Sequence, residues 1–186
     1  MDAKEKIILG IDPGTTIMGY GVVLIQKNKL QMVSMGVIDL SKLANQSLKL
    51  KKIFERCLFL IDEYKPDELA IEAPFYGKNV QSMLKLGRAQ GVAIASALYR
   101  EIPVFEYSPK KIKQSITGNG NASKEQVAGM LKTLLNIDKL PKYLDATDGI
   151  AAAVCHFYQS NSPAGSAGKK HSGWESFIKD NPGRIT

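Results

Sequence analysis

The sequence predicts an α/β fold: a mixed five-stranded sheet with helices on both faces. Short β-branched and apolar runs indicate strands, and longer segments with apolar residues three and four positions apart indicate helices. Their order along the chain is β-β-β-α-β-α-β-α-α-α, and a strand meander followed by alternating strands and helices implies a mixed sheet covered by helices. With 186 residues, 44% of them hydrophobic, the chain is long enough for one such domain and a tail.

The first three elements are expected to be strands. Residues Lys6–Asp12 (KIILGID) form a continuous apolar run that ends at a Pro-Gly turn. Strands at Gly19–Ile25 and Leu30–Leu40 follow, joined through a turn at Lys27–Asn28. Short connections of this kind join antiparallel neighbours, so we expect an antiparallel meander.

The remaining elements alternate between helix and strand before the chain ends in helices. Ser47–Tyr64 has apolar residues along one helical face, and Pro66 ends that helix. Ser108 is expected to cap a helix that has Pro109 at its first position. The other expected elements are strands at Glu68–Ala73 and Val104–Tyr107 and helices at Asn79–Tyr99, Lys124–Leu135 and Asp145–Tyr158.

The composition changes at Gln159. The segment that follows, SNSPAGSAGKKHSG, is rich in Ser, Gly and Ala, which is typical of flexible linkers. We therefore expect residues 1–159 to form the folded domain. Residues 160–186 are expected to be a flexible basic tail, in which WESFIKDNPGRIT could form a short docking helix.

Bulk properties narrow the class of partner and the location. The formal net charge of +7 favours a polyanionic partner. No apolar run reaches the length of a membrane-spanning helix, and the N-terminus lacks the features of a signal peptide. We therefore expect a cytoplasmic location, with Cys57 and Cys155 as reduced thiols in the core.

Four carboxylates have unusual surroundings. Asp12 ends the first buried strand, Glu72 lies inside the apolar segment AIEAP, and Asp145 and Asp148 are one turn apart on the last helix. Each alone has an ordinary explanation, as a turn former, a strand-end partner of a lysine, or an aspartate at a helix N-terminus. If all four converge, they repel one another, and bound divalent cations would relieve that repulsion. We predict that all four are catalytic and bind metal.

The predicted ligands indicate the metal and the reaction. Carboxylate oxygens favour Mg²⁺, with Mn²⁺ as a substitute, over zinc. Two such ions about 4 Å apart could clamp the attacking and leaving oxygens of a phosphoryl transfer. We therefore predict two ions per active site and a nuclease without a side-chain nucleophile. His156, eight residues after Asp148, is expected to be a packed helix residue and not a ligand.

Four segments, taken together, resemble the RuvC family of Holliday-junction resolvases. They cover roughly residues 6–158 in family-like order and read GIDPGTTIMGYGVV, AIEAPFYGKNVQSMLKLGRAQGVAI, PVFEYSPKKIKQSITGNGNASKEQV and LDATDGIAAAVCH. The resemblance implies an RNase H-like fold, a homodimer, Mg²⁺ dependence and paired symmetric nicks in four-way junction DNA during recombination and repair. It leaves open whether a branch-migration motor complex binds.

The resemblance also assigns roles to individual residues. The four acidic positions of the family fall on the four carboxylates above. Its stacking aromatic matches Phe75, and its basic residues near the scissile phosphate match Lys113 and Lys124. The sequence departs from the family at Ala73–Pro74, where many members have Gln-Val. Whether Pro74 alters base stacking by Phe75 is left open.

Further DNA contacts are expected around the carboxylates. Aromatic residues beside a nuclease centre can stack on unpaired bases, although they can equally pack beneath their own loop. Lysines that flank the Gly/Asn-rich segment TGNGNAS suit a surface that follows a phosphate backbone, although lysines are also common on solvated faces. The predicted DNA-binding residues are Phe75, Tyr76, Lys78, Lys85, Arg88, Lys113 and Lys124.

The helix at Asn79–Tyr99 is the predicted dimer surface, because matched cuts on two strands call for a two-fold axis. It carries more apolar residues than one buried stripe uses, and we expect its small residues to lie on one side and permit close packing. The apolar set is Met83, Leu84, Leu86, Val92, Ile94 and Leu98, and the small set is Gly87, Ala89, Gly91, Ala93 and Ala95.

Three other functions are compatible with parts of this pattern. Asp12–Thr16 also matches the D-x-G-T-T phosphate loop of actin-like and sugar-kinase-like ATPases, although a single domain lacks their second nucleotide-binding half. A DNA-binding module without catalysis would use the same basic surface, but four carboxylates would repel phosphate. A nuclease of the same fold that cuts a flap or an RNA–DNA hybrid is the third alternative.

Overall fold

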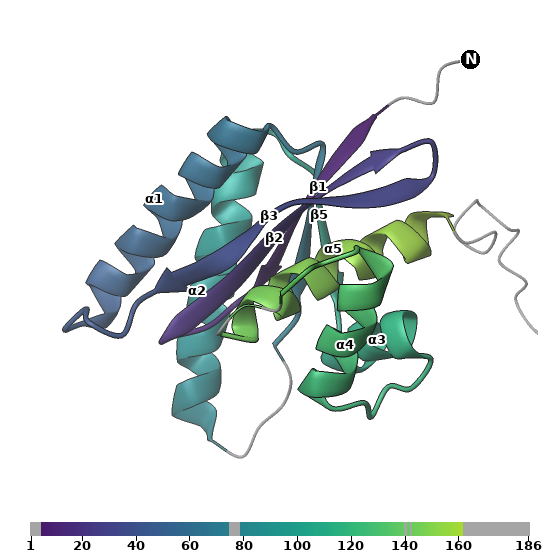
Figure 1. The fold of residues 1–186 in the computed structure, drawn as a ribbon. Coiled ribbons are helices and arrows are strands. Elements are labelled where there is room, and N and C mark those ends of the chain that lie inside the picture. The colour runs from purple at the N-terminus through teal and green to yellow at the C-terminus, as the bar shows by residue number, and fades with distance from the viewer. Residues whose placement is uncertain (1–4, 75–78, 140, 142, 162–186) are drawn as a thin grey trace, which may run out of the picture.

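The computed structural model describes residues 5–74, 79–139, 141 and 143–161, which form five strands and five helices (Figure 1). The predicted order of elements is confirmed, and the predicted ends differ from the observed ones by at most three residues. The elements are β1 (Lys6–Asp12), β2 (Ile17–Gln26), β3 (Lys29–Asp39), α1 (Gln46–Tyr64), β4 (Glu68–Glu72), α2 (Val80–Tyr99), β5 (Val104–Tyr107), α3 (Pro109–Thr117), α4 (Lys124–Leu134) and α5 (Asp145–Asn161).

The five strands form one mixed sheet with the order β3-β2-β1-β4-β5. β1, β2 and β3 pair antiparallel, as predicted, and the turn between β2 and β3 has positive φ angles at Lys27 (50°) and Asn28 (60°), as a two-residue hairpin requires. β4 pairs parallel with β1 and β5 pairs parallel with β4. The carboxyl ends of β1, β4 and β5 therefore lie at one edge of the sheet.

Helices cover both faces of the sheet (Figure 1). α1 and α2 pack on one face, over a core that includes Leu9, Ile11 and Ile71. α3, α4 and α5 lie on the other face, over a core that includes Ile8 and Ala70. Neighbouring residues of β1 and β4 thus point to opposite cores, as the period of two in a β-strand requires.

The ends of the helices follow their capping residues. Ser108 accepts a hydrogen bond from the backbone N–H of Lys111, and Pro109 occupies the first turn of α3, as predicted. Ser123 and Gln126 form a capping box at the start of α4. That cap fixes where α4 begins, and it therefore fixes the backbone position of Lys124, the first residue of the helix.

Three glycines let α5 lie directly on β1 and β2. A Cβ atom at Gly10 would lie 2.1 Å from the carbonyl oxygen of Gly149, and one at Gly19 would lie 1.8 Å from that of Asp145. Gly149 in turn faces the backbone of Tyr20. Backbone therefore packs against backbone at the start of α5, and this brings the first turn of the helix to the end of β1.

Cys57 and Cys155 are free and buried, as predicted. Burial raises the pKa of the Cys57 thiol to about 12. No helix in the described part of the chain is long and apolar enough to cross a membrane. The predicted tail lies outside the described residues from residue 162 onward, so the domain boundary near residue 159 stays a prediction.

The close approach of α5 predicts the effect of adding one methyl group to the sheet. Gly10→Ala places a Cβ against the backbone of Gly149 and Ala153, and we expect it to lower the free energy of unfolding by about 3 kcal/mol. Chemical denaturation measures this change. Gly129→Ala on α4 is the control: its Cβ meets open space, and alanine should stabilise the helix by about 0.5–1 kcal/mol. Equal stabilities for the two variants would contradict the packing of α5 described above.

Candidate active site

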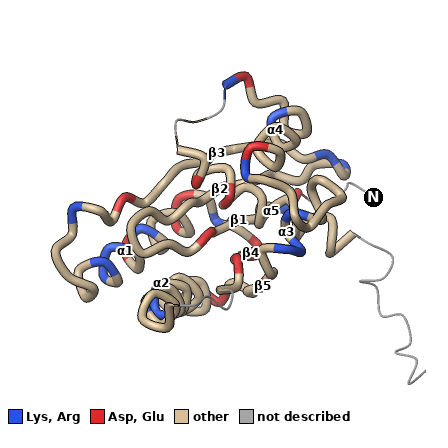
Figure 2. The backbone as a smooth tube through the Cα atoms, turned by 90° about the horizontal axis from the view of Figure 1, so that it is seen from below, with Lys and Arg blue, Asp and Glu red and all other residues tan. Residues whose placement is uncertain are grey.

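Four carboxylates meet at the edge of the sheet where β1 and β4 end. Asp12 is the last residue of β1 and Glu72 the last of β4, and the two strands are parallel neighbours with Ile11 opposite Ile71. Asp145 and Asp148 lie in the first turn of α5. We call Asp12, Glu72, Asp145 and Asp148 the acidic cluster. Figure 2 views the fold from below and shows acidic positions near β1, β2 and β4, with basic positions on the surrounding helices.

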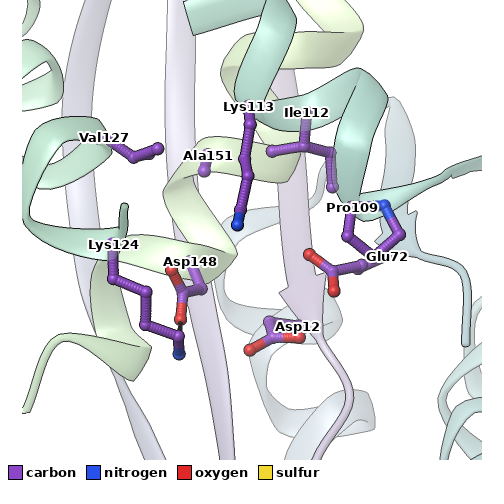
Figure 3. A pocket seen from close by; sticks show the side chains of 9 residues that line it. All are labelled: Asp12, Glu72, Pro109, Ile112, Lys113, Lys124, Val127, Asp148 and Ala151. Atoms are coloured by element: carbon purple, nitrogen blue, oxygen red, sulfur yellow. Dashed lines mark hydrogen bonds and ion pairs between the residues drawn. The ribbon is translucent and has the colours of Figure 1, made fainter. Parts of the chain in front are cut away.

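The separations within the acidic cluster are short enough for a shared cation. Carboxylate oxygens of Asp12, Asp145 and Asp148 all lie within 4.8 Å of one another. Glu72 stands outside this group of three but lines the same pocket as Asp12 and Asp148 (Figure 3). The structure thus brings together all four residues that the sequence singled out, and their catalytic role stays a prediction.

The pocket at the acidic cluster has a volume of about 180 Å³ and is open on one side. Its walls come from β1, β4, α3, α4 and α5. Figure 3 shows Lys113 reaching from α3 into the space between Asp148 and Glu72, while Lys124 approaches Asp148 from α4. The lining residues are Asp12, Glu72, Pro109, Ile112, Lys113, Lys124, Val127, Asp148 and Ala151.

An adjoining pocket extends the site toward α2. It is lined by Asp12 and Glu72 again, together with Pro74 and Leu86. Pro74 leads into residues 75–78, which lie outside the described residues. The two pockets share Asp12, Glu72 and Lys124, so they adjoin at the carboxylates that end β1 and β4.

Crowding and burial disfavour ionisation of Asp12 and Glu72 when no cation is bound. Burial raises the pKa of Asp12 to about 8, and the negative charges of Glu72 and Asp148 add to the effect. Burial likewise raises the pKa of Glu72 to about 7, with Asp148 adding and Lys124 and Lys113 opposing. A carboxylate with so high a pKa needs a nearby positive charge to stay ionised at neutral pH.

Lys124 supplies one positive charge inside the acidic cluster. Its Nζ lies 2.5 Å from Asp148 and 3.5 Å from Asp145. Partial burial lowers the pKa of Lys124, but the hydrogen bond and the charge of Asp148 outweigh this, so the pKa is raised. One ammonium group cannot balance four carboxylates, and the excess negative charge is what a divalent cation would neutralise.

The donors of the acidic cluster fit a hard divalent cation. All of its ligand atoms are carboxylate oxygens, which suit Mg²⁺ or Mn²⁺ better than zinc. His156 is buried elsewhere and bonds to Tyr107 and Glu68, which confirms the prediction that it is a packed helix residue. The structure therefore supports a metal site made of oxygen ligands alone.

The predicted DNA-binding residues divide into three groups. Lys113 and Lys124 lie in the pocket beside the carboxylates. Lys85 and Arg88 are exposed on α2 and do not line either pocket at the acidic cluster. The other three, Phe75, Tyr76 and Lys78, lie outside the described residues.

Two residues that the sequence analysis did not single out contact the backbone of the segments that carry Asp12 and Glu72. Gln90, only 7% exposed on α2, donates from Nε2 to a carboxylate oxygen of Glu106 at 2.7 Å and lies 3.5 Å from the carbonyl oxygen of Glu72. Lys49 on α1 donates to the carbonyl oxygen of Thr15 at 2.8 Å, in the turn after Asp12. The sequence could have identified Gln90, because a polar residue beside the buried stripe of a helix needs a hydrogen-bond partner. No comparable pattern in the sequence indicates the contact made by Lys49.

Known proteins of one family resemble the chain in sequence and in structure. The family model described as crossover junction endodeoxyribonuclease RuvC matches residues 8–156. A relative from Christiangramia forsetii, named crossover junction endodeoxyribonuclease RuvC, is 64% identical over 182 residues, which cover 98% of this chain and 94% of the relative.

Solved structures of Thermus thermophilus RuvC share the fold. The protein alone has a TM-score of 0.74 at 30% identity, and the match covers 82% of this chain and 94% of that one. The same protein in complex with Holliday junction substrate has a TM-score of 0.73 at 28% identity, with the same coverage. The predicted RNase H-like fold is therefore confirmed. With a family match over most of its length and this degree of identity to relatives, the chain belongs to the RuvC family of crossover junction endodeoxyribonucleases.

Proposed function

We propose that the chain resolves four-way DNA junctions by paired symmetric nicks, with two Mg²⁺ ions per active site held by the acidic cluster and with Mn²⁺ as a substitute. The observation that carries this proposal is the convergence of carboxylates from β1, β4 and α5 beside two lysines. Membership of the RuvC family supports the choice of DNA junctions as substrate. Membership of the RuvC family also disfavours the alternative function, that of an actin-like or sugar-kinase-like ATPase.

The position of each carboxylate suggests its share in metal binding. Asp12 lies in both pockets, and its charge interacts with Glu72 on one side and with Asp148 on the other. Asp12 is therefore the residue best placed to contact both ions, with Glu72 on one side and the α5 aspartates on the other. When bound, such ions supply a hydroxide nucleophile at neutral pH and stabilise the departing 3′-oxygen.

The two lysines would bind the phosphate group. Lys113 already points into the pocket, so its ammonium group can contact a phosphate oxygen above the carboxylates (Figure 3). Lys124 is paired with Asp148, and neutralising that carboxylate would free the ammonium group for DNA. Positive charges fixed beside the reacting phosphate can offset the charge that develops in the transition state. Phe75 and Tyr76, which lie outside the described residues, stay predicted base-stacking residues.

The proposed homodimer would form through one face of α2. Leu84 and Leu98 are 52% and 58% exposed, and Gly87 and Gly91 between them have open space where a Cβ would lie. Ala95 on the same face is also exposed. An exposed helix face with small residues between two leucines permits close packing against an identical helix across a two-fold axis.

The structure corrects two details of the predicted dimer surface. Val92 and Ile94 are partly buried against the protein's own core, so only part of each side chain is open to a partner. Ala89 and Ala93 are fully buried, whereas Gly91 is exposed, so the small residues do not share one side. The reason is geometric: residues two positions apart on an α-helix point about 200° apart.

The cytoplasmic location and a branch-migration motor as partner stay predictions.

Removal of one carboxylate separates cutting from binding. Asp12→Asn removes a ligand and its charge, so we expect cleavage of a labelled four-way junction in Mg²⁺ to fall at least roughly a hundredfold. Binding of the same junction in EDTA at neutral pH should be unchanged, because Asp12 without a bound cation already holds a proton there. Asp138→Asn, at an exposed acidic position, is the matched control for the charge change and should cut normally. A normal rate for Asp12→Asn would refute the proposed mechanism.

The same assay tests the substrate. The wild-type chain should cut the four-way junction at symmetric positions in Mg²⁺ and leave duplex, flap and RNA–DNA hybrid largely intact. Preference for a flap or a hybrid would instead favour the alternative nuclease of the same fold. Activity that survives in EDTA would contradict metal dependence.

The raised carboxylate pKa values predict an unusual pH dependence of stability. The folded protein holds a proton on Asp12 up to about pH 8, whereas the unfolded chain releases it near pH 4, so folding is progressively disfavoured between these values. In EDTA, the advantage of Asp12→Asn over wild type in the free energy of unfolding should therefore grow by roughly 4 kcal/mol from pH 5 to pH 8.5.

Urea titrations at several pH values measure this difference. Mn²⁺ should raise the melting temperature of the wild type more at pH 8.5 than at pH 6, because the ligands must lose their protons first. Asp12→Asn should show little shift in melting temperature with Mn²⁺. A difference between the two proteins that does not vary with pH would show that Asp12 is ionised throughout and that the acidic cluster is less crowded than described.

The proposed dimer predicts the effect of a charge on the exposed face of α2. Gly91→Arg places a long cation between Leu84 and Leu98, and we expect it to lower dimer affinity at least roughly tenfold. Sedimentation velocity over a range of concentrations measures the change. Met130→Arg, at an exposed position on α4, is the control and should stay dimeric. A wild-type chain that is monomeric at high micromolar concentration and still cuts both strands in concert would contradict the proposal.

A further inference from the structure

A second group of polar side chains is buried at the other end of α5. His156 is only 2% exposed, and both of its ring nitrogens have partners. Nδ1 lies 2.6 Å from the hydroxyl of Tyr107, and Nε2 makes a short contact with a carboxylate oxygen of Glu68. Its ring stacks on that of Phe105, with centroids 4.3 Å apart. None of these residues lines the pockets at the acidic cluster.

The contacts of His156 fix the direction of each hydrogen bond. The ionised Glu68 can only accept, so Nε2 carries the ring proton, and Nδ1 accepts from the hydroxyl of Tyr107. Burial lowers the pKa of His156, against the opposing effect of Glu68, which is consistent with a neutral ring. Glu68 also pairs with Lys6 at 2.5 Å. The ion pair and hydrogen bonds that run from Lys6 through Glu68 and His156 to Tyr107 therefore give each of these four side chains a partner.

This group and the acidic cluster lie at two ends of the same pair of elements. On β4, Glu68 and Glu72 are four residues apart and point to the same face, a separation of about 13 Å. On α5, Asp148 and His156 are eight residues apart, a separation of about 12 Å. His156 meets Glu68 at one end, and Asp148 and Glu72 share a pocket at the other. The contact of His156 with Glu68 is therefore linked, through α5 and β4, to the placement of Asp148 relative to Glu72.

Tyr107 adds a second connection to the strand that carries Glu72. The two residues are register partners in the pairing of β4 with β5. The backbone N–H of Ala73, the next residue, donates to the carbonyl oxygen of Tyr107 at 2.8 Å. The residue whose hydroxyl bonds to His156 thus also holds the end of β4 in place.

The two ends of this arrangement have opposite electrostatic character. Asp148 and Glu72 repel each other when ionised and would push α5 away from β4. The contacts of His156 with Glu68 and Tyr107 are attractive and would resist that movement. We propose that His156, held by Glu68 and Tyr107, is a positioning residue that sets the register of α5 on β4 and β5 and thereby the placement of Asp148 opposite Glu72.

This proposal rests on the metal binding proposed above, and metal affinity is its most direct measure. His156→Leu keeps most of the volume of the side chain but removes both hydrogen bonds, and we expect it to weaken Mn²⁺ binding roughly tenfold, as substitutions of residues that support metal ligands do. Calorimetric titration of the metal-free protein with Mn²⁺ gives the affinity. Junction binding in EDTA should stay unchanged, because no DNA-contacting residue is altered.

A matched control separates positioning from general stability. Cys155 is the adjacent residue of α5, also fully buried, and its Sγ lies 3.2 Å from the hydroxyl of Ser115. Cys155→Ala should lower the melting temperature by a cavity effect but leave Mn²⁺ affinity unchanged. If His156→Leu also loses only stability and binds Mn²⁺ like the wild type, His156 is structural and the proposal is overturned.

A milder variant and a spectroscopic signature cover the case in which His156→Leu does not fold. Tyr107→Phe removes only the hydroxyl, and we expect Mn²⁺ affinity to fall about threefold. Nitrogen-15 NMR of the wild type should show the Nε2–H tautomer for His156, with His171→Gln assigning the other imidazole. Unchanged Mn²⁺ affinity in Tyr107→Phe, or an Nδ1–H tautomer in the wild type, overturns the proposal. Failure of the wild type to bind Mn²⁺ overturns the proposed function as well, whereas equal affinities in wild type and variants overturn only this inference.

Discussion

The candidate active site depends on the direct packing of α5 on β1 and β2. Gly10, Gly19 and Gly149 carry no side chain at this contact, so the helix backbone lies against the strand backbone. A helix held away by even one methyl group at Gly19 would carry its first turn, and with it Asp145, away from Asp12. The small residues of β1, β2 and α5 are therefore as much part of the site as the carboxylates that they bring together.

The same contact creates an electrostatic cost within the fold. Carboxylates from three elements lie close together, and the pKa values of Asp12 and Glu72 rise as a result. Lys124 and Lys113 offset part of this cost, and the hydrogen bonds around His156 hold α5 in place at its other end. Overall the chain carries a net charge of +7, which attracts DNA, while the acidic centre repels phosphate. Divalent cations held by the acidic cluster would resolve this conflict, because they bind carboxylate and phosphate oxygens at once.

Most of the fold and the centre of the site could be predicted from the sequence. Apolar patterns and helix-capping residues together located every strand and helix in the described residues, and Asp12 and Glu72 stood out because they lie in apolar strands. The faces of α2 were harder, because alanine and glycine give no hydrophobic contrast between the buried Ala93 and the exposed Gly91. The pairing of His156 with Glu68, 88 residues away, depends on tertiary register that local patterns do not contain.

A crystal structure of the chain soaked in Mn²⁺, with manganese located by its anomalous scattering, tests the central claim most directly. Two manganese positions about 4 Å apart should lie among Asp12, Glu72, Asp145 and Asp148, with Asp12 contacting both. Manganese bound elsewhere, or a Glu72 side chain that contacts neither ion, would contradict the assignment of the acidic cluster as a two-metal nuclease centre.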